Sequence, residues 1–413
     1  MSVRSCDVLV VGAGPAGSAA AIVAARSGLD VVLADKATFP RDKCCGDGLT
    51  AGALRLLEEL GVTPAQVPSW LRIDEVHTVG PSGYTVDLTL PQGRGQYAAV
   101  ARRRELDRAL VDRAAHTGAS VLQGCEVSDV DTTAADRVRA CVGGSAVQAR
   151  YLVAADGMWS PVRRQLGGAP AGYLGDWHAF RQYFSGASEQ ARRQLVVWFE
   201  RDLLPGYAWS FPLADGSVNV GFGIRRDGSR RVQDMKQVWE QLLERPTLRR
   251  VLGEGLQPEG THRAWPIPSR LDQLDKVTGR VLFAGDAAGA TDPMTGEGIG
   301  QAIETGMLAA RSLAAAGPHR PEEAGALYTR TLDLGMVRDH QLARRLSDVL
   351  ARPRGVELAM RLSDLSGWTR RNFTRWLFED YPRAVALTPA RWRPGLLSAP
   401  GAFPDPAQPD HAA

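Results

Sequence analysis

The chain has 413 residues, of which 44% are hydrophobic and 23% charged, and its formal net charge is +3. This length allows two domains, or one large elaborated domain, with an ample core. A net charge this small for the size argues against nucleic acid as a partner, and none is expected.

The cysteines and the apolar runs exclude further classes of protein. The five cysteines have no metal-ligand spacing, and their odd number argues against a disulfide framework, so no metal site is expected. No apolar stretch reaches about 18 residues, so no membrane span is expected. The first apolar run is too short for a signal peptide and leads straight into a glycine turn. We therefore expect a cytoplasmic protein.

The chain opens with the pattern of a dinucleotide phosphate loop. Residues 7–11 form an apolar run of strand length, and a small-residue helix is expected over 15–27. Between them, Gly12 permits a tight turn, Gly14 lets the backbone approach a pyrophosphate, and Gly17 lets the helix pack close to the strand. Ala16 belongs to the same loop, where the helix N-terminus offers N–H groups to the phosphates. A second strand, 29–34, leads to Asp35, which can bind a ribose hydroxyl, and to Lys36.

The next segments continue an α/β pattern. A loop over 38–48 precedes a helix over 51–60, and strand-like alternation follows over 75–90. A helix over 101–115 keeps its apolar positions three to four residues apart. Returning strands are expected at 120–127 and 150–155, and the second delivers Asp156 and Gly157 at its end. The ends of parallel strands are where an open α/β sheet binds ligands.

From residue 168 the pattern changes to short strands, at 195–199, 207–211 and 217–224, which predict an antiparallel layer over the cofactor. A buried strand at 281–284 and a helix at 298–315 follow. We therefore predict a Rossmann-like dinucleotide-binding domain (1–167, returning at 267–317) with an inserted antiparallel β-sheet substrate domain (168–266). A C-terminal helical region (318–393) and a Pro- and Ala-rich, poorly ordered tail (394–413) complete the chain.

A second glycine- and aspartate-rich turn follows the strand at 281–284. Asp286 lies at the end of this strand, where it can bind a ribityl chain or cap a helix. The turn continues through Pro293, Gly296, Gly298 and Ile299, which open a helix whose N–H groups are expected to face the isoalloxazine ring and stabilise reduced flavin. A dinucleotide that contacts both the N-terminal glycine loop and this turn, far away in sequence, must be long and buried. That description favours FAD over NAD, so the Rossmann-like domain is predicted to be an FAD-binding domain.

Taken together, the glycine triplet, Asp156-Gly157 and Gly285-Asp286 resemble the three fingerprints of the p-hydroxybenzoate hydroxylase superfamily of FAD-dependent oxidoreductases, over roughly residues 7–310. Within it, residues 39–48, 205–212 and 218–221 are similar to the geranylgeranyl reductase family, most of all to its menaquinone-reductase-like members. Cys44 departs from the proline that this family commonly has there. The resemblance implies an FAD enzyme that saturates double bonds of a prenyl chain by hydride transfer from reduced flavin.

The resemblance also implies roles for particular residues. The candidate catalytic residues are Cys45, Tyr207 and Trp209; the alternatives are a small buried residue supporting a loop for Cys45 and core packing for the two aromatic residues. Because Tyr207, Trp209 and Phe211 alternate on a strand, all three are expected to line one wall. The remaining cofactor-binding candidates are Arg41, Cys45, Gly46, Asp47, Gly48 and Arg103, the last within an Arg-x-x-Leu-Asp pattern.

Three other functions stay open at this point: a flavin monooxygenase, a flavin-dependent halogenase, and a redox-sensing flavoprotein. The loop at 39–48 argues against the first, and the scarcity of lysine in the N-terminal half argues against the second. The reductant is expected to be NAD(P)H or a ferredoxin-like donor, and the oligomeric state is open. The C-terminal helices predict either a solvated cap or peripheral membrane contact through Arg338, Arg344, Arg345, Arg370, Arg371, Arg375, Trp368 and Trp376.

Overall fold

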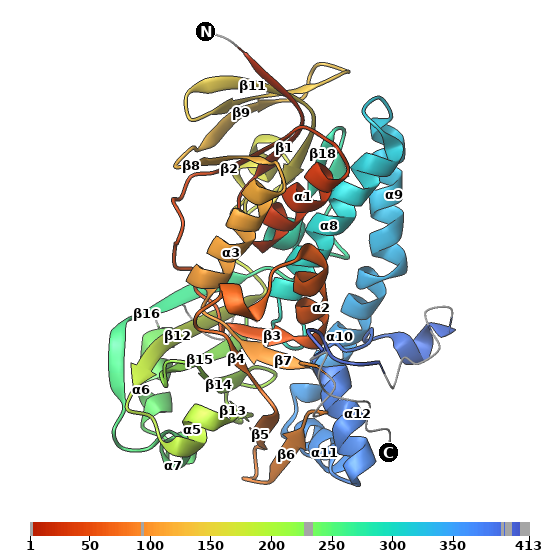
Figure 1. Cartoon of the computed structure of the whole chain (residues 1–413). Helices are drawn as coiled ribbons and strands as arrows, with labels where there is room; N and C mark the ends of the chain where they lie inside the picture. Colours follow the sequence, from red (N-terminus) through yellow and green to blue (C-terminus); the bar gives the residue numbers. More distant parts are fainter. Residues whose placement is uncertain (1–2, 92–94, 227–233, 390–391, 393–398, 405–413) are drawn as a thin grey trace.

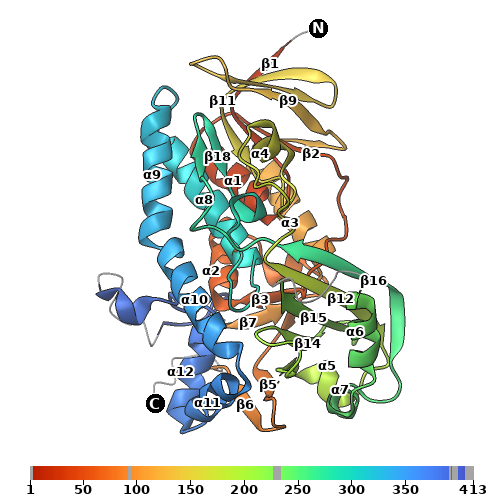
Figure 2. The same ribbon diagram turned by 180° about the vertical axis from the view of Figure 1, so that it is seen from behind.

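The computed structural model describes residues 3–91, 95–226, 234–389, 392 and 399–404. The strands of this part of the chain form three sheets, and helices pack around them (Figures 1 and 2). The two large sheets lie at opposite ends of the molecule, with the phosphate-loop sheet near the N-terminus. The predicted combination of a Rossmann-like domain, a second sheet domain and C-terminal helices is confirmed.

The first sheet has the strand order β17-β18-β11-β1-β2-β8. Its central strands are parallel to one another: β1 pairs in parallel with β2 and with β11, and β11 pairs in parallel with β18. The residues of β1 from Val8 to Val11 are buried, as expected of a strand covered on both faces. The bounds are β1 (Arg4–Val11), β2 (Val31–Asp35), β8 (Ser120–Gln123), β11 (Ser145–Ala154), β17 (Val277–Thr278) and β18 (Val281–Phe283), and a hairpin of β9 (Val127–Asp131) and β10 (Val138–Val142) extends β11.

Small residues bring the helices close to this sheet. A Cβ atom at Gly17 would lie 1.8 Å from the Gly12 carbonyl oxygen, and one at Gly306 would lie 2.0 Å from the Ala16 carbonyl oxygen. Glycine therefore lets α1 approach both its own loop and α8. The helices around this sheet are α1 (Pro15–Arg26), α2 (Ala51–Leu60), α3 (Arg103–His116), α4 (Pro161–Gln165), α8 (Ile299–Ala316) and α9 (Pro321–Leu334).

The second sheet has the order β16-β12-β15-β14-β13-β5-β6, and it corrects the predicted division of the chain. β5 and β6, from residues that the prediction placed in the first part of the FAD-binding domain, join it beside β13. The β5–β13 pair is parallel, so the layer is not wholly antiparallel. The bounds are β5 (Glu75–Val79), β6 (Thr85–Thr89), β12 (Trp177–Ser185), β13 (Leu195–Trp198), β14 (Tyr207–Pro212), β15 (Val218–Arg225) and β16 (Gln257–Ile267).

The two faces of this second sheet serve different purposes. On one face Phe180, Trp198 and Phe222 pack with Trp239 and Leu252 in a buried cluster, which α5 (Glu189–Arg193), α6 (Asp234–Leu243) and α7 (Pro246–Leu252) help to form. Because side chains alternate along a strand, the residues between these point the other way, into a cavity. The substrate sheet thus has its own core on one side and a binding surface on the other.

The C-terminal helices close the far end of the second sheet. These helices are α10 (Met336–Leu350), α11 (Pro353–Ser363) and α12 (Gly367–Leu377), and the last two lie next to β6 in Figure 1. A small sheet of β3 (Gly48–Thr50), β7 (Ala98–Val100) and β4 (Leu71–Arg72) lies between the two large ones. Of the predicted tail, residues 394–398 and 405–413 lie outside the described residues, whereas Ala402 is buried and bridges Gln96.

Candidate active site

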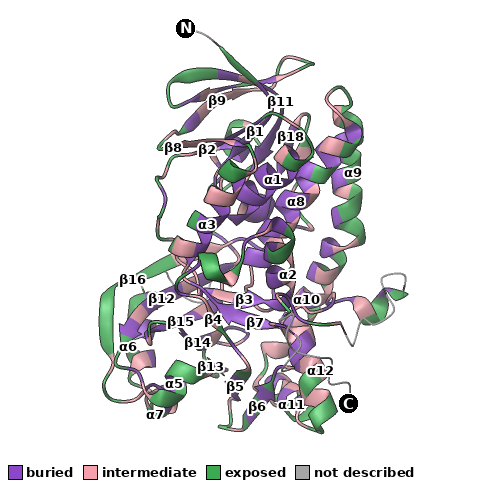
Figure 3. Ribbon diagram, in the orientation of Figure 1, coloured by how far each residue is buried: buried purple, intermediate pink, exposed green. Residues whose placement is uncertain are grey.

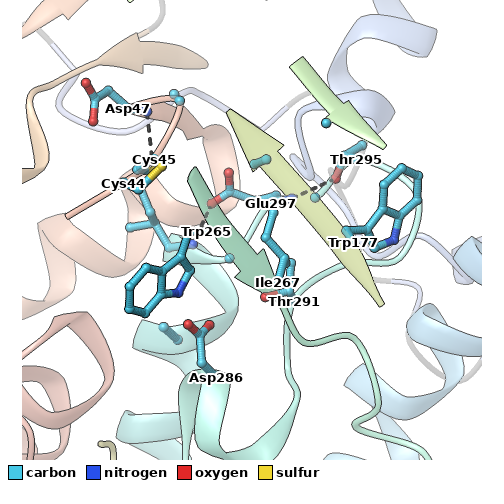
Figure 4. Close-up of a pocket in the computed structure, with 18 of the residues that line it drawn as sticks. Cys44, Cys45, Asp47, Trp177, Trp265, Ile267, Asp286, Thr291, Thr295 and Glu297 are labelled. Atoms are coloured by element: carbon cyan, nitrogen blue, oxygen red, sulfur yellow. Dashed lines mark hydrogen bonds between the residues drawn. The ribbon is translucent and has the colours of Figure 1, made fainter. Parts of the chain in front are cut away.

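A cavity of about 960 Å³ runs from the phosphate loop, past the second sheet, to α10, α11 and α12. This volume lies at the upper end of the usual range for ligand sites. Every predicted cofactor-binding and catalytic residue lines it except Gly17 and Pro293. Figure 4 shows Cys45 together with Asp286 and Glu297, which come from a part of the chain more than two hundred residues later, around this cavity.

The ends of four parallel strands form the cofactor end of the cavity, as predicted. The residues that follow β1, β11 and β18 there are Gly12, Asp156 and Asp286, and Asp35 ends β2. The Asp35 carboxylate accepts hydrogen bonds from the amides of Ala13 (2.7 Å) and Ala37 (2.8 Å), so it holds the glycine loop in shape. Each of its oxygens keeps a second lone pair, so the predicted ribose contact stays a proposal.

Two carboxylates at this end fit the hydroxyl groups of a ribityl or ribose chain. Asp156 Oδ1 is buried without a hydrogen-bond partner among the described residues, while Oδ2 accepts from the Val162 amide (3.0 Å). Burial raises the pKa of Asp156. No described group hydrogen-bonds to the Asp286 carboxylate, and Ala284 is the residue at the N-cap of the short 3₁₀ helix there. An orphaned buried oxygen calls for a donor, which a bound FAD supplies.

Arginines adjoin the phosphate loop. A Cβ atom at Gly14 would lie 3.5 Å from Arg41 Nη2, so this guanidinium lies over the loop where a pyrophosphate is expected. Arg41 also pairs with Asp107 (3.3 Å). Arg103 is buried and binds Asp107 through two nitrogens (2.8 and 2.9 Å), which raises its pKa despite burial. Asp107 therefore holds both arginines beside the cavity, and the residues present fit FAD.

Asp47 ties the loop at 44–48 to the second sheet. Its Oδ2 accepts from the Tyr183 hydroxyl (2.5 Å) and from Asn219 Nδ2 (2.9 Å), and the same Asn219 nitrogen donates to the Cys45 carbonyl (2.9 Å). Asp47 is buried, and burial raises its pKa. Sequence reasoning assigned Asp47 to the cofactor; its carboxylate instead bonds protein groups that position Cys45.

The aromatic strand forms one wall, as predicted, because Tyr207, Trp209 and Phe211 all line the cavity. A Cβ atom at Gly48 would lie 3.0 Å from the Phe211 ring, so glycine there lets the loop lie against this wall. The Tyr207 hydroxyl donates to the Thr295 carbonyl, and Trp209 Nε1 donates to Asn219 Oδ1 (3.1 Å). The hydrogen bonds of the Tyr207 hydroxyl and of Trp209 Nε1 therefore fix the orientation of both rings.

Cys45 is a neutral thiol in this environment. Burial raises its pKa to about 11, and its sulfur accepts from the Asp47 amide (3.3 Å). A thiol with this pKa remains protonated at neutral pH and is a weak acid. The neighbouring Cys44, which departs from the family pattern, lies near the Arg263 carbonyl (3.5 Å).

The structure corrects the prediction for the N-terminus of α8. Glu297 Oε1 accepts hydrogen bonds from the amides of Ile299 and Gly300 (both 3.0 Å), so these N–H groups face a side chain of the protein and not an isoalloxazine ring. α8 begins at Ile299, and Pro293 lies in the preceding turn outside the cavity lining. The prediction used only the glycine spacing; the acid between Gly296 and Gly298 was the sequence signal that could have indicated this cap.

Glu297 belongs to a cluster of acids that sequence reasoning missed. Arg383 lies 3.4 Å from both Asp292 and Glu379, and it is the cation that these acids share. Burial first, and then the charge of Glu379, raise the pKa of Glu297 to about 8. Arg383 and several hydrogen bonds lower the pKa of Asp292. Burial first, and the charge of Asp292, also raise the pKa of Glu379, to about 7, so of these three acids Glu297 keeps its proton to the highest pH.

The other end of the cavity is apolar. Side chains from the second sheet and from the C-terminal helices line it: Val76, Leu88, Leu195, Val197, Leu350, Val356, Met360, Phe373 and Leu377. We call this end the apolar arm. Tyr207 and Glu297 line the same cavity, so a long hydrocarbon chain in the arm can reach these residues.

Comparison with known proteins agrees with this geometry. A family model described as an FAD binding domain matches residues 5–329. The chain is 34% identical over 380 residues to the menaquinone reductase of Mycolicibacterium smegmatis, covering 85% of this chain and 86% of that protein. It is 32% identical over 330 residues to digeranylgeranylglycerophospholipid reductase 1 of Methanothermobacter thermautotrophicus, covering 76% of this chain and 78% of that protein.

The fold is also shared with a solved structure. The geranylgeranyl bacteriochlorophyll reductase-like protein of Thermoplasma acidophilum superimposes with a TM-score of 0.78 at 22% identity, covering 95% of this chain and 100% of that one. The chain therefore belongs to the family of FAD-dependent oxidoreductases that contains the menaquinone and geranylgeranyl-type reductases.

Proposed function

We propose that the chain reduces carbon–carbon double bonds in a prenyl chain, with FAD as its cofactor. The observation that carries this proposal is the continuity of one cavity from the dinucleotide end to the apolar arm. A polar aromatic substrate would not need an arm lined by aliphatic side chains of six elements. The names of the relatives, which act on prenyl-bearing quinones and lipids, support the same substrate class.

An isolated alkene needs a proton as well as a hydride. Reduced FAD, when bound, supplies the hydride to one carbon, and an acid must give a proton to the other. We assign that proton to the Glu297 carboxyl group and not to Cys45, because the pKa of the thiol is higher. The π faces of Tyr207 and Trp209 stabilise positive charge that develops on the more substituted carbon. Electrons reach FAD from NAD(P)H or a ferredoxin-like donor.

The product mass tests this proposal. Pre-reduced enzyme incubated anaerobically with menaquinone or a geranylgeranyl lipid is expected to add two hydrogens for each double bond reduced. The measurement is mass spectrometry of the extracted lipid, with heat-killed enzyme as the control. An unchanged lipid without oxygen, together with an aromatic substrate that gains one oxygen atom in air, would instead identify a monooxygenase.

Filling the apolar arm is expected to weaken substrate binding. Ala359 lines the arm from α11, and phenylalanine there occupies space that the hydrocarbon chain needs. We expect KM for a long prenyl substrate to rise about tenfold, a typical cost of overpacking, with unchanged FAD content. Leu327→Phe on α9, outside the cavity, is the matched control. Equal KM values for the two variants would show that the chain does not bind in this arm.

A further inference from the structure

The outer surface of α11 and of the start of α12 is apolar. Leu358, Leu362, Leu365 and Trp368 are each more than half exposed, and together they span only eleven residues of the chain. Leu358 and Leu362 lie on one helix face because they are four residues apart. Figure 3 shows exposed stretches on both helices at the end of the molecule far from the N-terminus. Large apolar side chains gathered in this way mark an interaction site.

The charges around this surface are positive. Arg352, Arg354, Arg361 and Arg371 are exposed on the same segment. Its acids are already engaged: Glu357 accepts from the Ser82 amide (2.8 Å), and Asp364 accepts from Tyr84 (2.6 Å) and Arg370 (2.6 Å). A surface that combines leucine and tryptophan with arginine is complementary to the headgroups and acyl boundary of an anionic bilayer.

Of the residues that the sequence predicted for membrane contact, Trp368 and Arg371 belong to this surface, whereas three others do not. Arg344 binds Asp272 (2.7 Å), Arg375 is buried against Asp380, and Trp376 Nε1 donates to the Arg383 carbonyl (3.1 Å). These side chains are therefore committed to the protein. The exposed Leu358 and Leu362 of α11 take their place on this surface.

The same helix separates the surface from the apolar arm. The inner face of α11 lines the arm through Val356, Ala359 and Met360, while Leu358 and Leu362 face outward. Val349, at the end of α10, both lines the cavity and is more than half exposed, so the arm reaches the surface there. None of the helices in the described part of the chain is long and apolar enough to cross a bilayer.

We propose that this surface, formed by Leu358, Leu362, Leu365 and Trp368 with Arg354, Arg361 and Arg371, binds an anionic lipid bilayer. Docking there places the open end of the arm against the membrane, so a hydrocarbon chain passes from bilayer to cavity without crossing water. The purpose of the docking rests on the proposed function, but the docking itself is measured without any substrate.

The test is co-sedimentation of the FAD-loaded enzyme with vesicles. Wild-type protein is expected to pellet with phosphatidylglycerol vesicles, and less with phosphatidylcholine vesicles. The triple variant Leu362→Ser/Leu365→Ser/Trp368→Ser is expected to lose at least about tenfold in partitioning, because it removes most of the apolar surface that enters the bilayer. The matched control replaces exposed leucines elsewhere with serine: Leu174, Leu334 and Leu387.

Each outcome has one meaning. Loss of binding in the triple variant but not in the control supports the bilayer as the partner. Wild-type protein that stays in the supernatant, or a triple variant that pellets like wild type, overturns the proposal. A wild-type dimer that the triple variant converts to monomer would assign the surface to a second copy. Reduction of a detergent-dispersed prenyl substrate by the triple variant is measured separately, so failure of docking and failure of the proposed function are distinguishable.

Discussion

Replacing Glu297 by glutamine is expected to lower the rate of alkene reduction about 100-fold or more, the range of a lost general acid. The amide keeps an oxygen for the Ile299 and Gly300 amides, so the start of α8 stays capped. It has no acidic proton to give. The measurement is single-turnover reduction by pre-reduced enzyme, with bound FAD quantified by absorbance. Glu379→Gln, which removes the neighbouring charge but leaves Glu297, is the matched control and is expected to retain most of the rate.

The pH dependence separates an acid from a merely structural residue. Glu297 with a pKa of about 8 donates a proton only while protonated, so the wild-type rate is expected to fall as the pH rises through about 8. Burial and the charges of Glu379 and Asp292 raise this value, and the hydrogen bonds from the Gly300 and Ile299 amides lower it. This fall in the rate with rising pH is expected to disappear in Glu297→Gln and to occur at a lower pH in Glu379→Gln. A Gln variant with the wild-type rate and pH profile would assign the proton to another group.

The same acid links stability to pH. The folded protein holds the Glu297 proton more tightly than the unfolded chain does, because burial disfavours its charged form. Its contribution to the free energy of unfolding is therefore complete below the ordinary carboxyl pKa, near 4.5, and is lost as the pH rises through about 8. Denaturant unfolding of wild type and Glu297→Gln at several pH values reports this difference independently of activity.

Replacing Gly17 by alanine is expected to reduce FAD binding to about a tenth of wild type or less and to destabilise the fold by about 1–3 kcal/mol, the usual cost of overpacking. The new Cβ would lie 1.8 Å from the Gly12 carbonyl oxygen and 3.2 Å from Val10. Because the first contact is with backbone, the phosphate loop itself must move. FAD content and thermal unfolding of the purified protein measure the two effects.

Gly367→Ala is the control for this prediction. It is also a helical glycine, at the start of α12, and a Cβ there meets nothing within 4 Å. Alanine has the higher helix propensity, so this variant is expected to bind FAD normally and to unfold at an equal or higher temperature. If Gly17→Ala behaved in the same way, the loop would not need the close approach that the structure shows.

Local spacing explains what was predictable from the sequence. The phosphate loop, the strand before it and Asp35 lie within about thirty residues of each other, so their geometry follows from turn and helix rules. The alternation of Tyr207, Trp209 and Phe211 likewise predicts one wall from strand periodicity alone, and all three line the cavity. Asp156 and Asp286 were predicted at strand ends, because the ends of parallel strands are where an open α/β sheet binds ligands.

The rest depends on contacts between distant segments, which periodicity does not record. The alternation over 75–90 predicted strands. It did not predict that β5 pairs in parallel with β13, which lies more than a hundred residues later in the chain. The pairing of Asp47 with Tyr183 and Asn219 joins three segments in the same way. Nothing in the local sequence distinguishes Glu297 and Glu379 from other acids. Their burial in the folded protein raises the pKa of Glu297 to about 8 and that of Glu379 to about 7. The sequence thus determined the cofactor loop and the aromatic wall, whereas the acid and the apolar arm arise only where the two sheets and the C-terminal helices meet.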